Sequence, residues 1–219
     1  NLNIASGQRV GLVGCNGVGK STLLKLLVGI LPMQQGTLEV AGLAMHRENF
    51  ASIRRKVGYI FQDSDSQLFM PTVAADVAFA AQNYGYPTEE VAARSHRALQ
   101  QVHIEDCADR PVYRLSGGQK KLASIAGILT LDPELILMDE PSAALDPKNR
   151  RNLIEILRGL PCAMLIASHD LDFIYDTCDR VVLLYEGRIA ADGPAEEILH
   201  DGALLADCDL ELPLRFQSI

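Results

Sequence analysis

GLVGCNGVGKSTLLKLL, residues 11–27, decides the fold of this chain. An apolar run over 8–14 ends in glycine and is typical of a short buried strand. The run over 20–31 has apolar residues at helical spacing, with a proline directly beyond it. Between them, GCNGVGKST over 14–22 fits the pattern G-x-x-x-x-G-K-[ST]. A glycine-rich loop between a strand and a helix predicts a phosphate-binding site.

The loop supplies backbone amides, one cation and one hydroxyl. Its glycines let the backbone approach phosphates closely, and the amides at the helix N-terminus attract the negative charge of the phosphates. Lys20 is predicted to reach the β- and γ-phosphates of ATP, and the Ser21 hydroxyl to hold Mg²⁺. The residues predicted to bind the nucleotide here are Gly14, Cys15, Asn16, Gly17, Val18, Gly19, Lys20, Ser21 and Thr22.

Composition narrows the class of protein. Apolar residues make up 48% of the 219 residues and charged residues 22%, which is ordinary for a globular domain with a sizeable core. A formal net charge of −8 argues against a nucleic-acid partner, which would need a basic face. The five scattered cysteines predict reduced thiols in a cytosolic protein. No apolar run is long enough to span a bilayer. Because the loop follows Asn1 almost at once, we expect a leading strand to precede this residue.

The order of the predicted elements indicates an α/β fold. Further short strands are predicted over 36–42, 56–62, 134–138, 163–168 and 180–187. From Asp63 to about residue 115 the sequence is mostly helical and polar-faced, so a helical lobe is inserted into a parallel-sheet core. We expect a single domain over 1–219, with a nucleotide-binding core over 1–62 and about 127–199, a helical lobe over about 63–126, and a C-terminal tail over 200–219 without an interpretable signal.

Polar residues follow several of these strands at what should be one edge of the sheet. LILMDEP (135–141) is an apolar strand that ends in two carboxylates. Asp139 is predicted to hold Mg²⁺ through its water shell, and Glu140 to polarise the attacking water. His169 follows the strand over 163–168, where a neutral imidazole could bond the γ-phosphate. Gln62 ends another strand at the same predicted edge.

A second amide-rich helix start lies far along the chain, in RLSGGQKKL (114–122). Ser116 is predicted to cap this helix, and the two glycines after it leave bare amides. A single chain cannot wrap one nucleotide with both loops if the lobe stands off from the core. Two chains facing each other head to tail could do so, with Lys20 of one and Ser116 of the other on the same γ-phosphate. The residues expected to serve the opposite chain's ATP are Ser116, Gly117, Gly118 and Gln119.

Six motifs, in chain order, resemble those of the ATP-binding subunit of ABC transporters. They are GCNGVGKST (14–22), FQ (61–62), LSGGQ (115–119), LILMDEP (135–141), SAALD (142–146) and SHD (168–170). EGRIAADGPAEEIL (186–199) is also similar to the family, so the resemblance covers nearly the whole chain. It implies an ABC-type ATPase with a P-loop NTPase (RecA-like) core and an inserted helical lobe, which closes as a dimer on two ATP molecules and opens after hydrolysis.

The resemblance also implies a role for each matching position. The residues are the Walker A loop over 14–22, the Q-loop Gln62, the signature over 116–119, the Walker B Asp139, the catalytic Glu140, the D-loop Asp146 and the switch histidine His169. Catalysis would rest on Glu140, His169 and Gln62, and the metal on Ser21, Gln62 and Asp139. Cys15 stands where proline is common and Leu122 where an arginine usually follows the signature. The aromatic residue that stacks on adenine in the family would lie before Asn1.

A narrower likeness lies in FQDSDSQLFMPTVAADVAFAAQNYGYP (61–87), which resembles the ATPases of energy-coupling-factor importers for cobalt and nickel ions. It implies a second ATPase subunit, either identical or a close paralogue, together with an integral membrane coupling subunit and a substrate-binding membrane subunit. The ATPase would be peripheral, at the cytoplasmic face of the cell membrane. We expect residues just after Gln62, with acids beside Leu68, Phe69 and Met70, to dock the coupling subunit.

Two other readings stay open at this point. An ABC-type ATPase for DNA maintenance would normally carry a long coiled-coil insertion, and none interrupts this chain. A soluble ATPase could instead act in the assembly of other components, such as iron–sulfur clusters, without transport. Cobalt or nickel ion is the first candidate cargo of an importer and a vitamin the second.

Overall fold

The computed structural model describes residues 1–217 and is built around a six-stranded sheet. The strands are β1 (Arg9–Val13), β4 (Val57–Ile60), β5 (Leu135–Asp139), β6 (Ala163–Ala167), β7 (Arg180–Tyr185) and β8 (Arg188–Pro194). Their order in the sheet is β4-β5-β6-β1-β7-β8. All neighbours are parallel except β8, which is antiparallel to β7. The predicted α/β core is confirmed, with a sheet that is mainly parallel.

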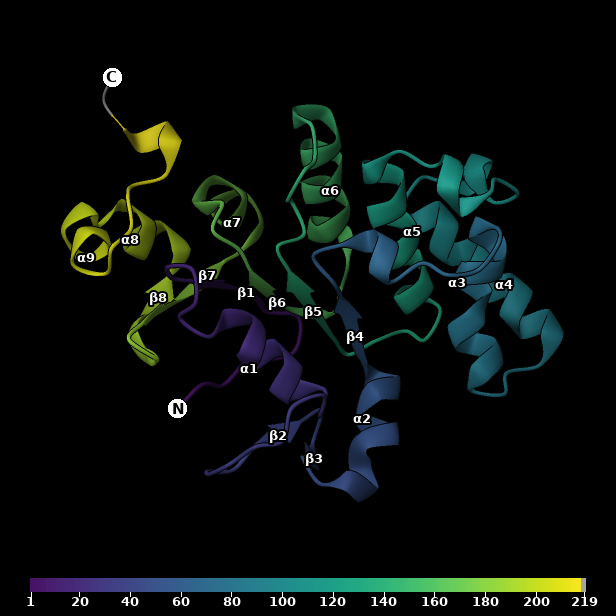
Figure 1. Cartoon of the computed structure of the whole chain (residues 1–219), viewed down its shortest axis with the longest axis horizontal. Helices are drawn as coiled ribbons and strands as arrows, with labels where there is room; N and C mark the ends of the chain where they lie inside the picture. Colours follow the sequence, from purple (N-terminus) through teal and green to yellow (C-terminus); the bar gives the residue numbers. More distant parts are fainter. Residues whose placement is uncertain (218–219) are drawn as a thin grey trace.

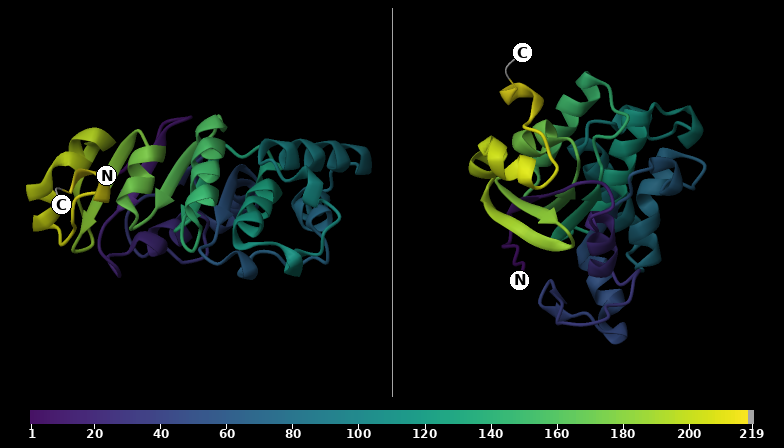
Figure 2. Two further views of the ribbon diagram at one scale, coloured as in Figure 1. Left: turned by 90° about the horizontal axis from the view of Figure 1, so that it is seen from above. Right: turned by 60° about the vertical axis from the view of Figure 1, so that its left-hand side comes forward.

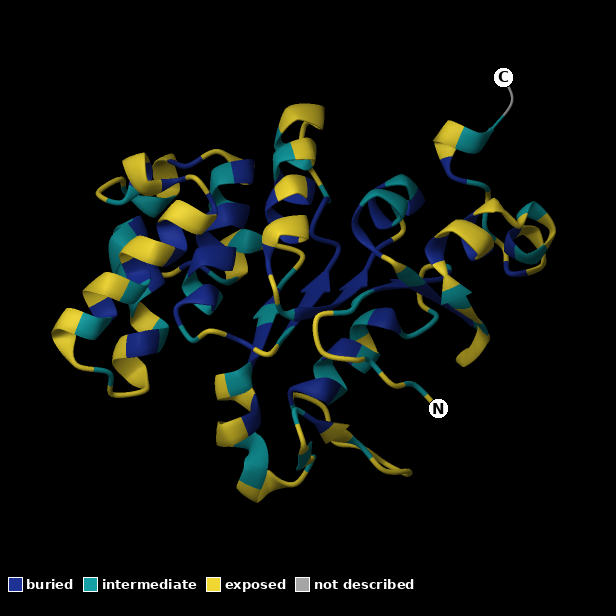
Figure 3. Cartoon of the chain, turned by 180° about the vertical axis from the view of Figure 1, so that it is seen from behind, coloured by how far each residue is buried: buried dark blue, intermediate teal, exposed yellow. Residues whose placement is uncertain are grey.

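Helices cover both faces of this sheet. They include α1 (Lys20–Leu27), α2 (Phe50–Lys56), α5 (Gly117–Leu129), α6 (Pro147–Gly159) and α7 (Leu171–Thr177). Ile136 and Met138 of β5 enter the core that α5, α6 and α7 cover, whereas Leu137 between them enters the core beneath α1 and α2. Strands β1, β5, β6 and β7 are accordingly largely dark blue in Figure 3. Burial on both faces is why the sequence of these strands is almost continuously apolar.

A helical lobe lies beside β4. Its helices are α3 (Val73–Asn83), α4 (Thr88–Gln101) and α5. Figure 1 and Figure 2 show the lobe at one end of the molecule and the C-terminal helices at the other. α5 also belongs to the core, because a Cβ added to Gly58 of β4 would lie 2.6 Å from Cδ1 of Ile128. The division expected near residue 126 therefore falls inside a helix that serves both parts.

Two elements differ from the prediction. Only Glu39–Val40 (β2) of the run over 36–42 forms a strand, and it pairs with Leu43–Ala44 (β3) in a separate small sheet. β8 was not predicted, and it makes the sheet mixed rather than wholly parallel. It joins β7 through Glu186 and Gly187, whose φ angles of 48° and 74° suit the tight hairpin turns that follow the twist of the strands.

The C-terminal segment is folded, although its sequence gave no interpretable signal. It contains α8 (Ala195–His200), α9 (Gly202–Asp207) and a short 3₁₀ turn over Leu214–Phe216. The Phe216 ring stacks on His200 and meets Tyr175 of α7 edge-on, with centroids 3.9 Å and 5.1 Å apart. The end of the segment is thereby held against α7. None of the helices in residues 1–217 has both the length and the apolar character that crossing a bilayer requires.

Candidate active site

The parallel strands β4, β5, β6 and β1 bring their carboxyl ends to one edge of the sheet. The polar residues predicted from the sequence follow directly: Gln62 after β4, Glu140 after β5, His169 after β6 and the phosphate-binding loop after β1. Ligands of open α/β sheets bind at this edge, where loops rather than strands determine the chemistry. The fold thus places these segments, which lie far apart in the sequence, along a single edge.

The loop between β1 and α1 depends on glycine at both of its ends. Gly14 has φ 148°, and a Cβ there would lie 2.5 Å from the carbonyl oxygen of Leu184. Gly19, with φ 111°, precedes α1 in a left-handed conformation. The Nζ of Lys20 folds back over the loop and donates to the carbonyls of Gly14 at 2.6 Å and Cys15 at 3.1 Å. The loop therefore encloses a cation next to the free amides of a helix N-terminus, which suits a polyphosphate.

Ser21 and Asp139 are in direct contact although they lie 118 residues apart. The Ser21 hydroxyl donates to Oδ1 of Asp139 at 2.9 Å, between the first turn of α1 and the end of β5. Mg²⁺ prefers hard oxygen ligands and usually keeps several waters while it binds one or two carboxylates and substrate phosphates. A hydroxyl and a carboxylate beside a phosphate-binding loop are a donor set of this kind, so the two residues fit the metal.

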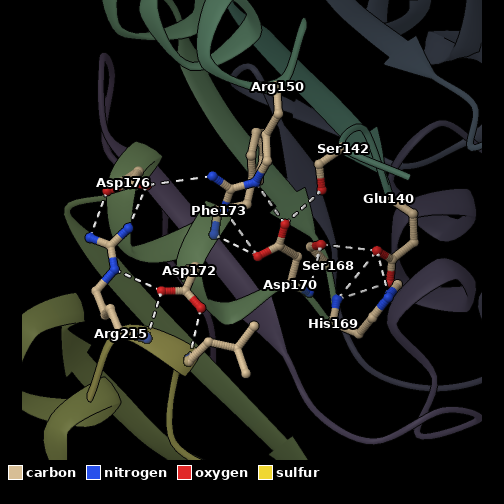
Figure 4. Close-up of polar contacts among 11 residues, drawn as sticks. Glu140, Ser142, Arg150, Ser168, His169, Asp170, Asp172, Phe173, Asp176 and Arg215 are labelled. Atoms are coloured by element: carbon tan, nitrogen blue, oxygen red, sulfur yellow. Dashed lines mark hydrogen bonds and ion pairs between the residues drawn. The ribbon is translucent and has the colours of Figure 1, made fainter. Parts of the chain in front are cut away.

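Glu140 is 8% exposed, and its carboxylate is held by the two residues that directly follow β6. Its Oε2 accepts from the Ser168 hydroxyl at 2.9 Å, and its Oε1 from the His169 amide at 3.0 Å. Nδ1 of His169 lies 2.9 Å from Oε2 (Figure 4). The Glu140 backbone has φ 47°, which is unusual for a residue with a side chain. A strained backbone and an anchored carboxylate together fix where this side chain points.

Asp170 holds the loop that carries His169. Its carboxylate caps α7 by accepting from the Phe173 amide at 2.8 Å, and its two oxygens receive a fork from Arg150 of α6 at 2.9 Å and 3.1 Å. Burial alone would raise the pKa of Asp170, but the hydrogen bonds from Arg150 and from the Phe173 amide outweigh burial, so the pKa lies below its ordinary value. The carboxylate is therefore a fixed anion behind the histidine.

Gln62 meets α5 through its backbone. The Nζ of Lys121 donates to the carbonyls of Phe61 at 2.9 Å and Gln62 at 3.0 Å. Burial lowers the pKa of Lys121 to about 8, although the charges of Asp63 and Asp139 favour the ammonium. The Gln62 side chain is exposed at this edge, where it could contact a metal or a phosphate. α5 is thereby tied to the segment that follows β4.

The second amide-rich helix start has the cap that the sequence predicts. Ser116 Oγ accepts from the Gln119 amide at 3.3 Å, and Gln119 Oε1 accepts from the Ser116 amide at 3.0 Å, which is a reciprocal capping box. Gly118 faces Asn149 of α6, because a Cβ at 118 would lie 2.6 Å from Cγ of that side chain. Figure 1 shows α5 in the lobe and α1 beneath the sheet, so the two loops stand on separate elements.

Asp146 caps α6 by accepting from the amides of Lys148 at 2.9 Å and Asn149 at 3.0 Å. The hydrogen bond from the Asn149 amide is the largest influence on its carboxyl and lowers its pKa. This capping role explains an aspartate at the start of the helix. Its predicted contact with nucleotide stays a prediction.

Three site residues escaped the sequence analysis. Ser168 was quoted only as part of SHD, although its hydroxyl is what holds Glu140. Lys121 is buried and donates to two backbone carbonyls, and Arg150 reaches Asp170 from another helix. Only Ser168 had a signal in the sequence, since it directly precedes the predicted histidine.

Comparison with known proteins agrees with this geometry. A family model described as ABC transporter matches residues 1–143. The chain belongs to the ABC transporter family. As a member, it is an ATP-binding subunit whose hydrolysis of ATP is coupled to transport. A putative ABC transporter ATP-binding protein of Geobacter sulfurreducens is 45% identical over 217 residues, which cover 99% of this chain and 87% of the relative.

Two further relatives belong to more narrowly named systems. An energy-coupling factor transporter ATP-binding protein of Methanospirillum hungatei is 39% identical over 219 residues, which cover 98% of this ATPase and 55% of that protein. The solved structure of cbiO1 from Clostridium perfringens, part of the ABC transporter complex cbiONQ, matches with a TM-score of 0.84 at 36% identity. That match covers 97% of this chain and 87% of the other. The architecture is therefore that of an ABC ATPase, with a mainly parallel sheet and a helical subdomain.

Proposed function

We propose that this ATPase is the motor subunit of an energy-coupling-factor importer and hydrolyses Mg-ATP with Glu140 as the residue that activates water. The observation that carries the proposal is the meeting of two anchored pairs at one sheet edge, Ser21 with Asp139 and Glu140 with Ser168. One pair suits a metal and the other holds a carboxylate ready to accept a proton. The named relatives support the transporter type.

In this mechanism each part of the edge has one task. The loop amides and Lys20 bind the phosphates. Ser21, Asp139 and Gln62 would hold Mg²⁺, which when bound would neutralise charge on the phosphate oxygens. Glu140 orients the attacking water and takes up its proton. His169 lies against Glu140 and presents its ring, 64% exposed, toward the open edge, where it can bond the γ-phosphate.

The second loop is proposed to act on the ATP of a second ATPase subunit, identical or closely related, in a head-to-tail dimer. The amides of Gly117 and Gly118 start a 13-residue helix and are free of the capping box formed by Ser116 and Gln119. A helix N-terminus of this length attracts an anion. In the dimer, the second loop of each chain would close over the γ-phosphate bound by the other.

The surface beyond Gln62 is proposed to dock the membrane coupling subunit. A groove of about 250 Å³ lies between α2, β4 and α3, and its aromatic lining includes Phe69, Phe79 and Tyr84. Phe69 is 64% exposed and packs edge-on against Phe79 with ring centroids 4.8 Å apart. Exposed aromatic side chains around a groove are typical of an interaction site.

The acids of this segment have tasks within the chain. Asp65 forms an ion pair with Lys120 of α5, with Nζ and Oδ1 2.5 Å apart. Asp76 accepts from the amides of Phe69 and Met70, both at 2.8 Å, and so fixes the turn that carries the aromatic ring. The aromatic groove, rather than Asp65, is therefore the part of the docking surface to test.

A substrate-binding membrane subunit would complete the importer. Cobalt or nickel ion is the first candidate cargo and a vitamin the second. This ATPase would be peripheral, at the cytoplasmic face of the membrane.

Paired variants test the chemistry. Lys20→Ala should abolish both nucleotide binding and hydrolysis, because it removes the cation of the phosphate-binding loop. Glu140→Gln should keep ATP binding, lose turnover by about a hundredfold or more and accumulate an ATP-bound dimer. Binding is measured by calorimetry, turnover by phosphate release and the dimer by size exclusion. Hydrolysis by Glu140→Gln at nearly the parent rate would show that another group activates the water.

A second pair tests the docking surface. Phe69→Ala with Phe79→Ala should leave ATPase activity in solution largely intact, while pull-down of the membrane coupling subunit and uptake into cells are lost. Tyr113→Ala is the control, since this aromatic residue is 74% exposed but lies outside the groove. Uptake that survives the double change would place the coupling surface elsewhere on the ATPase.

A further inference from the structure

Five charged residues behind the active site take no direct part in the proposed hydrolysis. Asp172 and Asp176 lie on α7, Asp170 precedes this helix, Arg150 comes from α6, and Arg215 comes from the C-terminal turn. Figure 4 shows them as one continuous set of contacts that leads from Arg215 to Glu140. With three carboxylates and two guanidinium groups, the set has one anion more than it has cations.

Arg150 stands between two of these carboxylates. Its Nε and Nη2 fork onto Asp170 at 2.9 Å and 3.1 Å, and its Nη1 lies 3.7 Å from Oδ2 of Asp176. The first contact has the two-pronged geometry of a strong arginine–carboxylate pair, whereas the second is a longer ion pair. Arg150 is therefore engaged chiefly with Asp170, and Asp176 competes for it.

Arg215 satisfies the competing carboxylate. Its Nη1 and Nη2 donate to the two oxygens of Asp176 at 2.8 Å and 2.7 Å, and its Nε donates to Asp172 at 2.7 Å. The Arg215 side chain is 34% exposed and the Asp176 side chain 27%, so the pair is only partly open to solvent. Without Arg215, Arg150 would be the remaining guanidinium in contact with Asp176 in this set.

The position of Asp170 reaches the active site through two hydrogen bonds. Its amide donates to the Ser168 hydroxyl at 3.1 Å, and this hydroxyl donates to Glu140 at 2.9 Å. His169 lies between Ser168 and Asp170 in the chain and contacts the Glu140 carboxylate. A shift of Asp170 would therefore displace both groups that hold Glu140.

We propose that Arg215 is a positioning residue for hydrolysis: by satisfying Asp176 it leaves the Arg150 fork on Asp170, which keeps Ser168 and His169 against Glu140. The C-terminal turn thus takes part in setting the active site from the far side of α7. The proposal rests on the function proposed above, since it acts through Glu140.

The primary test is Arg215→Gln, measured as kcat and KM for ATP in the chain of 219 residues. We expect kcat to fall about tenfold, within the range that such networks transmit, with KM nearly unchanged because the phosphate-binding loop is untouched. Arg180→Gln is the matched control. Arg180 forks onto Asp192 with both distances at 2.6 Å, and this pair is about as exposed as that of Arg215 and Asp176. Arg180 begins β7 and so lies at the end of this strand away from the active site, and its loss should change kcat by less than about twofold.

A suppressor variant distinguishes positioning from simple docking of the tail. Asp176→Asn in the Arg215→Gln background removes the competing charge, so kcat should return to within about threefold of the parent. An Arg215→Gln protein with parental kcat overturns the proposal. The proposal is also overturned if kcat falls together with the melting temperature and Asp176→Asn does not restore kcat. His169→Ala tests the proposed function separately, since parental turnover there would remove the role of the histidine whatever Arg215 does.

Discussion

The hydroxyl of Ser168 is predicted to contribute to both stability and turnover. Ser168→Ala removes a donor to the Glu140 carboxylate at 2.9 Å and an acceptor of the Asp170 amide at 3.1 Å, at a residue with no solvent exposure. A hydrogen bond to a charged group contributes about 1.5–3 kcal/mol, and an unpaired buried amide costs about 1–3 kcal/mol. We therefore expect about 4 kcal/mol of lost stability, which lowers the melting temperature of a domain of this size by about 10 °C.

Turnover should fall as well, because the freed carboxylate is then held mainly by His169. A displacement of about 1 Å in a reacting group can cost about a hundredfold, so we expect a loss of about tenfold in kcat for partial release. Circular dichroism melting and phosphate release measure the two effects. Ser52→Ala on the exposed side of α2 is the control and should change neither. A Ser168→Ala protein with parental melting temperature and parental kcat would refute the assignment of Ser168 as the anchor of Glu140.

Three further predictions concern other parts of the site. Ser116→Arg should block hydrolysis while the isolated subunit still binds ATP, and mixing it with Lys20→Ala should restore one working site in the heterodimer; verified heterodimers without any activity would contradict shared sites. Alkylation of Cys15 should inhibit nucleotide binding, because the added group crowds the phosphate-binding loop, and Mg-ATP should protect the thiol. Labelling is measured by mass spectrometry, and equal labelling with and without Mg-ATP would exclude Cys15 from the nucleotide site. Lys121 has a pKa of about 8 in the folded protein and its ordinary value of 10.5 in the unfolded chain. Between these values the unfolded chain binds more protons, so the parent becomes more stable as the pH rises. The melting temperature of Lys121→Met relative to that of the parent should therefore decrease from pH 7 to pH 10. A constant difference across this range would mean that the lysine is not buried as a cation.

The sequence by itself determined which chemistry this protein performs. The loop over 14–22, the two carboxylates at the end of the strand LILMD (135–139) and the capped helix start at Ser116 are local patterns, each readable within about ten residues. Apolar strands buried on both faces also have a strong local signal, which is why the core strands were predicted. Such features are fixed by backbone requirements and by burial, and both are encoded in neighbouring residues.

Elements without a strong local pattern were missed. Most residues of β8 are exposed, and its sequence is RIAADGP. Neither an apolar run nor an alternating pattern marks it as a strand. Its pairing with β7 follows from the turn at Glu186 and Gly187. The C-terminal helices are similar, because their few apolar residues matter only once α7 provides a surface for them.

Only the tertiary structure decided how the active site is held. The contacts of Ser21 with Asp139, of Lys121 with the carbonyl of Gln62 and of Arg215 with Asp176 join residues 118, 59 and 39 positions apart. Side chains at such separations become neighbours because parallel strands are joined by long crossovers, which bring several loops to the same sheet edge. A sequence pattern states what each loop carries, but the distance and direction between two loops depend on how the sheet and its helices pack.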